Sequence, residues 1–249
     1  MSPSETTYSH PTSAHPPENT PDPTLTSSTA SASVEPSSTT TTDTQDAKVE
    51  THRQSTTYSS SSAQLSHLTL NLSRALRQFP DFPSPGILFE DICPIFRNPA
   101  TLNDLITALE LFIAPENGGP GKPDLIVGLD ARGFLMGPAL ALRIGAGFAP
   151  IRKKGKLPGQ VERASFKKEY GEDVFEIQAD AVEKGQKVLV IDDIIATGGS
   201  ASAAGQLVRR LGGDLIGFVF LLELDFLKGR DKLDAPVWTL LTGQKSNRN

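Results

Sequence analysis

Residues 188–202 read Val-Leu-Val-Ile-Asp-Asp-Ile-Ile-Ala-Thr-Gly-Gly-Ser-Ala-Ser, and this stretch is the most informative part of the chain. Its four apolar residues, 188–191, are typical of a strand that is buried on both faces. Asp192 and Asp193 follow where that strand should end, and the small-residue loop 196–200 then opens onto a helix-forming stretch. A strand, an acid pair and a glycine loop at a helix N-terminus together predict a site for a sugar that carries a phosphate.

The loop offers several groups that bind phosphate. Backbone N–H groups at Ala196, Gly198 and Gly199 and the positive end of the helix dipole favour an anion, and Thr197 and Ser200 add hydroxyl donors. Successive strand residues face opposite ways, so the two acids can reach different groups, such as ribose hydroxyls and a hydrated Mg²⁺.

Two other phosphate motifs do not fit this stretch. No Gly-Lys-Ser/Thr follows, as a Walker loop requires, and Gly-x-Gly-x-x-Gly, the dinucleotide fingerprint, is absent here. The plain alternative is a buried strand, an exposed acidic turn and a helix cap, because Asp-Asp and Gly-Gly are both common in turns. The combination of all three parts favours the phosphate site.

The composition divides the 249-residue chain into two regions. Residues 1–63 are rich in Ser, Thr and Pro, and no Lys or Arg occurs before Lys48. Such a segment cannot bury enough apolar surface to offset the entropy lost on ordering, so we expect it to be disordered. Residues 64–249 are long enough for one domain with its own core.

Composition also excludes several classes of protein. The N-terminus lacks the basic and apolar regions of a secretory signal, and no stretch has the apolar length of a membrane span. The single cysteine, Cys93, excludes an internal disulfide framework, so we expect a reducing, cytoplasmic location. The net charge of -5 argues against a nucleic-acid binder that relies on phosphate contacts.

Apolar periodicity predicts helices and strands that alternate along the second region. The expected helices cover 65–79, 98–109, 134–144 and 201–211. The expected strands cover 124–129, 149–152, 174–177, 188–191, 215–222 and 237–241, with a long mobile loop at 153–170. This alternation predicts an α/β fold with a parallel sheet covered on both faces. Ligands of such sheets bind beyond the carboxyl ends of the strands, where Asp130, Arg152 and Asp192 fall.

Three further stretches are informative together with 188–202. Residues 79–92 read Phe-Pro-Asp-Phe-Pro-Ser-Pro-Gly-Ile-Leu-Phe-Glu-Asp-Ile, and 128–141 read Gly-Leu-Asp-Ala-Arg-Gly-Phe-Leu-Met-Gly-Pro-Ala-Leu-Ala. Residues 151–159 read Ile-Arg-Lys-Lys-Gly-Lys-Leu-Pro-Gly, and Glu-Tyr-Gly follows at 169–171. The run at 188–202 resembles the 5-phosphoribosyl 1-pyrophosphate (PRPP) signature of type I phosphoribosyltransferases. All four runs, in collinear order, resemble the adenine phosphoribosyltransferases.

The resemblance implies a fold and an activity. The fold is a central, mostly parallel sheet flanked by helices, with a small N-terminal hood and a flexible lid loop. The activity is the conversion of adenine and PRPP to AMP and pyrophosphate with Mg²⁺, in purine salvage. It also implies a homodimer, because the family's arginine at the position of Arg152 comes from the neighbouring subunit.

The same resemblance assigns roles around the leaving group. Asp130, Ala131 and Arg132 match the family's pyrophosphate loop, which often contains a non-proline cis peptide, and Arg132 is a candidate catalytic residue. Arg152 and Lys156 are candidate phosphate ligands. By charge alone, a surface ion pair for Arg132 and a solvated loop for the lysines are the alternatives.

Further roles are implied for the lid, the hood and the acid pair. Glu169 is the candidate acid or base beside the adenine, and Tyr170 belongs to the nucleotide site. Taken alone, Glu169 reads as an ordinary exposed glutamate. In the hood, main-chain groups of Leu88 and Glu90 would bind the edge of the adenine, and Phe89 would cover its ring. Asp192 and Asp193 would contact the ribose hydroxyls, and Asp193 would also bind the metal, directly or through water. Residues 196–200 would hold the 5′-phosphate. Many relatives carry Lys or Arg in place of Glu90, which puts a role for its side chain in doubt.

Two rival functions stay open at this point. One is a phosphoribosyltransferase for another base, such as xanthine, hypoxanthine or guanine. The other is a sensor or repressor that binds PRPP without catalysis. The hood and the Arg-Lys-x-Gly-Lys-Leu-Pro-Gly run favour adenine, and the acidic N-terminal region with an intact Glu-Tyr-Gly disfavours a nucleic-acid-binding regulator.

Overall fold

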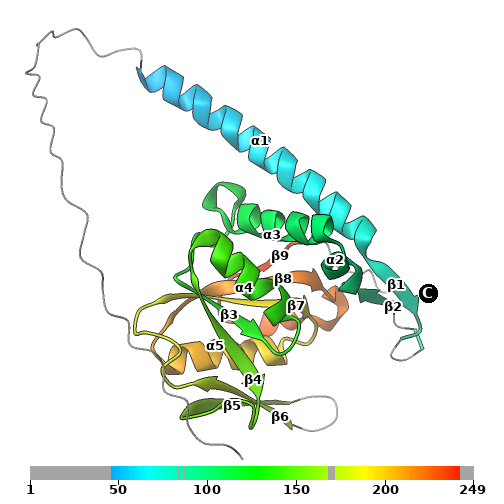
Figure 1. The fold of residues 1–249 in the computed structure, drawn as a ribbon, viewed down its shortest axis with the longest axis vertical. Helices are drawn as coiled ribbons and strands as arrows, with labels where there is room; N and C mark the ends of the chain where they lie inside the picture. Colours follow the sequence, from blue (N-terminus) through cyan, green and yellow to red (C-terminus); the bar gives the residue numbers. More distant parts are fainter. Residues whose placement is uncertain (1–45, 83–84, 87, 168–171, 242–249) are drawn as a thin grey trace, which may run out of the picture. The chain divides into compact units, whose positions relative to one another are not determined.

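The computed structural model describes residues 46–82, 85–86, 88–167 and 172–241 (Figure 1). The helices are α1 (Asp46–Ala75), α2 (Cys93–Arg97), α3 (Pro99–Ile113), α4 (Gly133–Ile144) and α5 (Gly199–Arg210), with short 3₁₀ turns η1 (Pro115–Asn117), η2 (Asp225–Leu227) and η3 (Gly229–Lys232). The strands are β1 (Arg77–Pro80), β2 (Leu88–Asp91), β3 (Leu125–Leu129), β4 (Gly147–Lys153), β5 (Val161–Lys167), β6 (Glu172–Gln178), β7 (Lys187–Ile195), β8 (Asp214–Glu223) and β9 (Val237–Thr239).

Seven strands form the central sheet, in the order β5-β6-β4-β3-β7-β8-β9. Five neighbouring strands, β4, β3, β7, β8 and β9, pair in parallel. In the middle of β3, Val127 lies opposite Ala149 of β4 on one side and Val190 of β7 on the other. Strand β6 is antiparallel to β4 and to β5. The sheet is therefore mostly parallel, as the sequence predicted.

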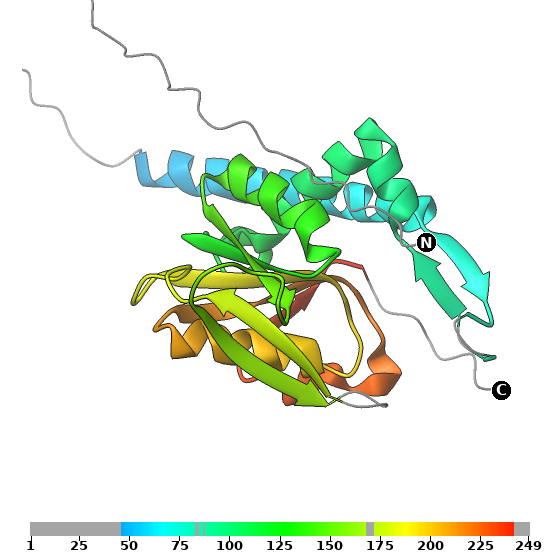
Figure 2. The same ribbon diagram turned by 60° about the horizontal axis from the view of Figure 1, so that its bottom comes forward.

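Helices cover both faces of this sheet (Figure 2). On β7, Leu189 and Ile191 belong to the core beneath α1 to α4, whereas Val188 and Val190 belong to the core beneath α5. All four are fully buried. The unbroken apolar run at 188–191 is explained by this burial on both sides.

The predicted helix boundaries agree with the capping residues. The Asn98 side chain accepts a hydrogen bond of 2.8 Å from the Ala100 N–H, and Pro99 is the first residue of α3. Gly145 ends α4 with a φ of 66°, the left-handed conformation that glycine adopts readily.

The first helix differs from the prediction at both ends. It begins at Asp46, so the boundary expected at 63/64 falls inside α1. Leu68 and Leu72 are buried and anchor the second half of this helix in the core. It ends at Ala75, and Phe79 lies in β1 opposite Phe89, because Pro80 and the pairing with β2 favour an extended chain.

The loop expected at 153–170 is wrong for residues 161–167, which form β5. Ala164 on this strand is buried, and the ring of Phe166 lies 4.8 Å from that of Phe175 on β6. The strand is at the edge of the sheet and carries charged residues, so it lacks the apolar run by which the other strands were found.

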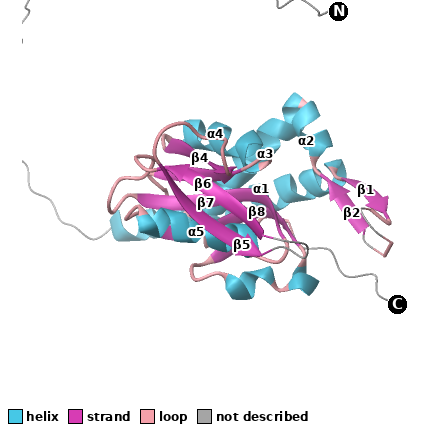
Figure 3. Ribbon diagram, turned by 90° about the horizontal axis from the view of Figure 1, so that it is seen from below, coloured by secondary structure: helices cyan, strands magenta, loops and turns pink. Residues whose placement is uncertain are grey.

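Strands β1 and β2 form a separate two-stranded sheet, seen beside the main sheet in Figure 3. An ion pair of 2.6 Å between Arg77 Nη2 and Asp91 Oδ2 joins the two strands. This hairpin contains the segment for which the sequence predicted a hood. Among the described helices, none is both long and apolar enough to cross a membrane.

Candidate active site

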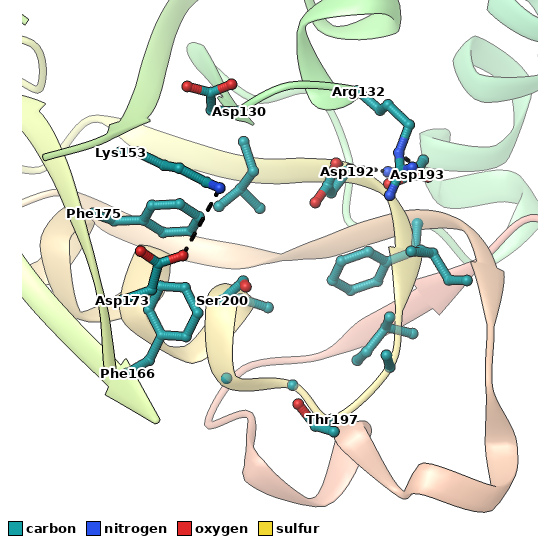
Figure 4. A pocket seen from close by; sticks show the side chains of 18 residues that line it. Asp130, Arg132, Lys153, Phe166, Asp173, Phe175, Asp192, Asp193, Thr197 and Ser200 are labelled. Atoms are coloured by element: carbon teal, nitrogen blue, oxygen red, sulfur yellow. Dashed lines mark hydrogen bonds and ion pairs between the residues drawn. The ribbon is translucent and has the colours of Figure 1, made fainter. Parts of the chain in front are cut away.

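A cavity of about 280 Å³ lies at the carboxyl ends of β3 and β7 (Figure 4). Its lining includes nine of the predicted site residues: Asp130, Arg132, Asp192, Asp193, Ala196, Thr197, Gly198, Gly199 and Ser200. A second cavity shares five of its six lining residues with the first and adds Ala131. The structure thus brings the loop after β3 and the run at 192–200 together around one hollow.

The acid pair lies within β7 and not after it, as the sequence had suggested. Pairing between β7 and β3 ends at Ile191, whereas pairing with β8 continues to Ile195 opposite Glu223. The acids therefore extend past the end of β3, on the part of β7 that has a neighbouring strand on one side. This extension gives both carboxylates access to the cavity.

The environment of Asp192 disfavours its negative charge. Burial first, and then the charge of Asp193, raise the pKa of Asp192 well above its ordinary value. The Asp193 N–H, which donates a hydrogen bond of 2.9 Å to Asp192 Oδ1, opposes this shift. A cation or a set of hydroxyl donors in the cavity would stabilise the ionised carboxylate.

Asp193 on β7 forms an ion pair with Arg132, which lies in the loop after β3. Arg132 Nε lies 2.6 Å from Asp193 Oδ2, and the side chains are 48% and 7% exposed respectively. One carboxylate oxygen of Asp193 is thus bound by Arg132. The arginine side chain is half exposed and also lines the cavity. A metal role for Asp193 stays a prediction.

The loop after β3 is held close against β7. The peptide between Asp130 and Ala131 is cis, as the resemblance implied. The Asp130 N–H donates to Ile151 O at 3.0 Å, which ties the loop to β4. At Gly133, an added Cβ would lie 2.6 Å from Ile191 O, so only glycine allows this approach.

The loop at 196–200 leads directly into α5. Gly198 is the N-cap residue, with a φ of 76° and no side-chain capping bond. Its carbonyl accepts from the Ser202 N–H at 2.9 Å, while the first N–H groups of a helix have no partner within the helix itself. Thr197 and Ser200 line the same cavity, so the predicted phosphate donors are gathered in one place (Figure 4).

The basic residues of 152–156 differ in whether they line the cavities at the acid pair. Arg152 Nε lies 3.3 Å from Asp130 Oδ2, and its Nη1 lies 3.4 Å from Lys156 O. Of the described cavities, neither that lined by the acid pair nor its neighbour includes Arg152 or Lys156. Lys153 lines both, and its Nζ lies 4.0 Å from Asp173 Oδ2. The roles of Arg152 and Lys156 as phosphate ligands stay predictions.

Sequence reasoning missed Lys153 and the residues of β5 and β6 that complete the cavity. Phe166, Asp173 and Phe175 line it, and they flank the Glu-Tyr-Gly run at 169–171. The available signal was the strand end itself, because Lys153 is the last residue of β4. Glu169 and Tyr170 lie outside the described residues.

The hood residues lie on β2, apart from the two cavities. Leu88, Phe89 and Glu90 are all partly exposed, and the Phe89 ring meets that of Phe82 edge-on at 5.1 Å. Gln78 Nε2 donates a hydrogen bond of 3.1 Å to Glu90 Oε1. The Glu90 side chain thus has a partner within the hairpin, and an adenine role for its main chain stays a prediction.

No group of three or more metal-binding side chains is assembled in the part of the chain that the structure describes. The site offers two carboxylates at its edge, and Mg²⁺ in such sites takes its remaining ligands from substrate phosphates and water. The donor set therefore fits a metal that arrives with its substrate.

Comparisons with known proteins identify the family of the chain. Residues 96–248 match the family described as the phosphoribosyl transferase domain. The adenine phosphoribosyltransferase of Yarrowia lipolytica is 60% identical over 181 residues, which is 73% of this chain and 99% of the relative. Adenine phosphoribosyltransferase 1 of Saccharomyces cerevisiae is 58% identical over 175 residues, 70% of this chain and 92% of the relative.

Solved structures give the same result. The Saccharomyces cerevisiae adenine phosphoribosyltransferase, complexed with an iminoaltritol bisphosphate and adenine, superimposes with a TM-score of 0.68 and 55% identity over 71% of this chain and 99% of the other. The Trypanosoma brucei enzyme, in complex with AMP, pyrophosphate and ribose-5-phosphate, has a TM-score of 0.62 and 26% identity over 73% of this chain and 83% of the other.

Proposed function

The chain belongs to the adenine phosphoribosyltransferases, and we propose that its cavity at the carboxyl ends of β3 and β7 is where adenine is joined to PRPP. The enzyme converts these substrates to AMP and pyrophosphate in purine salvage, on a type I phosphoribosyltransferase fold. The observation that carries the assignment of the site is the shared lining: the acid pair, the loop at 196–200 and the loop at 130–132 meet around one cavity.

The reaction is a substitution at the anomeric carbon of the ribose. A ring nitrogen of adenine forms a bond to this carbon, the bond to pyrophosphate breaks, and the nitrogen loses its proton. Positive charge builds on the ribose as pyrophosphate leaves, so the protein must orient the base, hold the leaving group and exclude water. Each of these tasks has a candidate among the residues of the site.

The 5′-phosphate, the ribose hydroxyls and the pyrophosphate of PRPP have separate candidate contacts. The 5′-phosphate is placed on the N–H groups and hydroxyls of 196–200, because they open α5 and line the cavity. The ribose hydroxyls are placed on Asp192, which lines the cavity beside them. Pyrophosphate is placed on the loop at 130–132, where Arg132 offers a fork of donors.

Mg²⁺ is the proposed cofactor. Bound to pyrophosphate, it would neutralise charge on the leaving group. Asp193 would hold it, directly or through water, since carboxylate oxygens are ligands that Mg²⁺ accepts. A cation there would also stabilise the ionised form of the neighbouring Asp192, whose pKa is raised by burial and by the charge of Asp193.

Glu169 is proposed as the acid or base for the adenine nitrogen, with Tyr170 beside the nucleotide. Their place in the sequence supports this: they lie between Phe166 and Asp173, which both line the cavity. A segment that closes here would exclude water and desolvate the carboxylate. Adenine itself is proposed to lie under the β1–β2 hairpin, read by the main chain of Leu88 and Glu90 with Phe89 over the ring.

The enzyme is proposed to act as a homodimer in which Arg152 and Lys156 serve the phosphates of the neighbouring site. The resemblance at Arg152 supports this, and neither side chain lines the two cavities at the acid pair, which leaves both available to a neighbouring site. Helix α4 supplies an apolar surface for the contact, with Leu135 48% and Leu142 85% exposed. The cytoplasm is the proposed compartment, in keeping with one cysteine, Cys93.

The test is AMP formation from adenine, PRPP and Mg²⁺, with guanine, hypoxanthine and xanthine in parallel. We expect turnover of adenine alone. Glu169→Gln should lower kcat by roughly 10²–10⁴-fold, the usual contribution of a general acid or base. Glu172→Gln, a glutamate three residues on, is the matched control and should retain activity.

The outcomes separate the rival functions. Turnover of another base would assign the enzyme to that base. Binding of PRPP without turnover of any base would identify a sensor. Full activity in Glu169→Gln would keep the enzyme and remove Glu169 from the chemistry.

A further inference from the structure

The loop at 196–200 packs against Gly229, which belongs to a later segment of the chain, residues 224–234. An added Cβ on Gly198 would lie 2.2 Å from Gly229 O, and an added Cβ on Gly229 would lie 2.2 Å from Ala196 O. The two backbones therefore touch at a distance that admits glycine on both sides. Gly229 is buried at this contact, as the first residue of η3.

Arg230, the next residue, fastens that segment to the sheet. Its Nε donates to Glu223 Oε1 at 3.0 Å, and its Nη2 also bonds the second oxygen of Glu223. Its Nη1 donates to Val237 O at 2.5 Å, and Nη2 reaches Thr239 Oγ1 at 2.5 Å. One guanidinium thus connects η3 to the end of β8 and to β9.

Two further contacts hold the segment at its ends. The Leu224 N–H donates to Ile195 O at 2.9 Å, which joins the start of the segment to the residue before the loop. Beyond η3, Asp234 Oδ1 lies 3.0 Å from Arg209 Nη1 on α5. The segment is therefore attached to β7, β8, β9 and α5, the elements that surround the phosphate loop.

We propose that residues 224–234 are the positioning element for the 5′-phosphate loop, acting through the contact of Gly229 with Ala196 and Gly198. Arg230 is a positioning residue that keeps Gly229 in place and does not touch the substrate. This inference rests on the proposed function only in naming 196–200 as the 5′-phosphate loop. Its consequence is selective: disturbing the segment should weaken binding of the sugar phosphate and leave pyrophosphate binding intact.

The test compares two probes by calorimetry, ribose 5-phosphate and pyrophosphate with Mg²⁺, on the full-length protein. In Gly229→Ala the new methyl group must displace Ala196, and in Arg230→Lys the forked contact to Glu223 is lost while the charge is kept. Both should raise the Kd of ribose 5-phosphate about tenfold or more, as expected when one charge-assisted hydrogen bond is lost. The Kd of pyrophosphate should change less than about twofold.

Matched controls separate positioning from general damage. Gly185→Ala places a methyl group at a glycine with a φ of 78° and no atom within 4 Å of the new Cβ, and Arg97→Lys alters an exposed arginine on α2. Both should leave the two Kd values unchanged. Thermal unfolding shows whether each variant folds. If Gly229→Ala does not fold, the comparison of Arg230→Lys with Arg97→Lys tests the proposal.

Equal weakening of both probes would overturn the inference, because a loss of folding or a general disturbance affects the whole site. Unchanged binding of ribose 5-phosphate in both variants would overturn it as well. Failure of the proposed function appears elsewhere: wild-type protein that makes no AMP contradicts the activity, whereas the ratio of the two Kd values needs no turnover.

Discussion

Arg132 Nε and Asp193 Oδ2 lie 2.6 Å apart and join the loop after β3 to the acidic end of β7. Each residue belongs to a different sequence motif, and neither motif alone indicates the pair. The Asp193 side chain is nearly buried and the Arg132 side chain is half exposed. Asp193 therefore orients the arginine, and the guanidinium N–H groups that do not contact Asp193 can bind a ligand in the cavity. Burial and the Asp193 charge raise the pKa of the neighbouring Asp192, and the smaller effect of the Arg132 charge lowers it.

Replacing Arg132 with Met should damage both activity and stability. The activity should fall by about 10²-fold or more, the usual effect of removing one donor that stabilises developing charge. The free energy of unfolding should fall by about 1–3 kcal/mol, since Asp193 is left as an unpaired charge and the half-exposed arginine softens the loss. Urea unfolding and initial rates of AMP formation measure the two effects. Arg97→Met on α2 is the control, and equal losses there would remove the ion pair from the explanation.

Replacing Lys153 with Met should raise KM for PRPP. Lys153 lines both cavities, and a lost hydrogen bond to a charged group is worth about 1.5–3 kcal/mol, or roughly 10–100-fold. The neighbouring Lys154→Met is a closely matched control, because Lys154 lines neither of these two cavities. Steady-state rates at varied PRPP distinguish them, and equal effects in the two variants would contradict a specific role for Lys153.

Acidification should remove a contribution to stability from Glu176. This carboxylate is 1% exposed and accepts hydrogen bonds of 2.8 Å from Arg163 Nε and from the Gly155 N–H, and these partners, Arg163 first, lower its pKa. A carboxyl whose pKa is lowered by folding stabilises the protein fully above its unfolded pKa, about 4.3, and less as the pH falls through the folded value. The wild type should therefore lose its advantage over Glu176→Gln as the pH drops below about 4.

Urea unfolding of wild type and Glu176→Gln at a series of pH values measures that difference. Glu110→Gln, which alters a surface ion pair with Arg143, is the control for the removal of one carboxylate. A difference between wild type and Glu176→Gln that stays constant from pH 7 to pH 3 would contradict the prediction.

Replacing Leu142 with Glu should separate the proposed dimer. The side chain is 85% exposed on α4, and a charge there opposes burial against a second copy. Light scattering should give twice the 26.6 kDa chain mass for the wild type and a single chain mass for the variant, with loss of activity. Leu70→Glu, at an exposed leucine on α1, should remain a dimer. A fully active monomeric wild type would contradict the shared site.

Sequence patterns predicted the centre of the fold well, for a physical reason. Strands such as 188–191 are buried on both faces and read as unbroken apolar runs. Strand β5 was missed because only its inner residues, such as Ala164 and Phe166, pack, while Glu162, Arg163 and Lys167 share the same seven residues. Edge strands of this kind carry too little periodic signal to be separated from a loop.

The site was predictable in its motifs and less so in its contacts. The acid pair and the glycine loop are local patterns, and they line the cavity as expected. Lys153 could not be chosen over Lys154, because their difference arises from where β4 ends. The approach of Gly229 to Gly198 joins two stretches distant in sequence, and neither stretch alone contains a sign of the other.

A crystal structure of the protein with bound AMP tests the central claim most directly. The account predicts the phosphate of AMP on the N–H groups of 197–200, with the ribose hydroxyls within hydrogen-bond distance of Asp192 and the adenine ring beneath the β1–β2 hairpin. The Arg132–Asp193 pair should remain at the edge of the same cavity. AMP with its phosphate bound anywhere other than the loop at 196–200 would contradict the account.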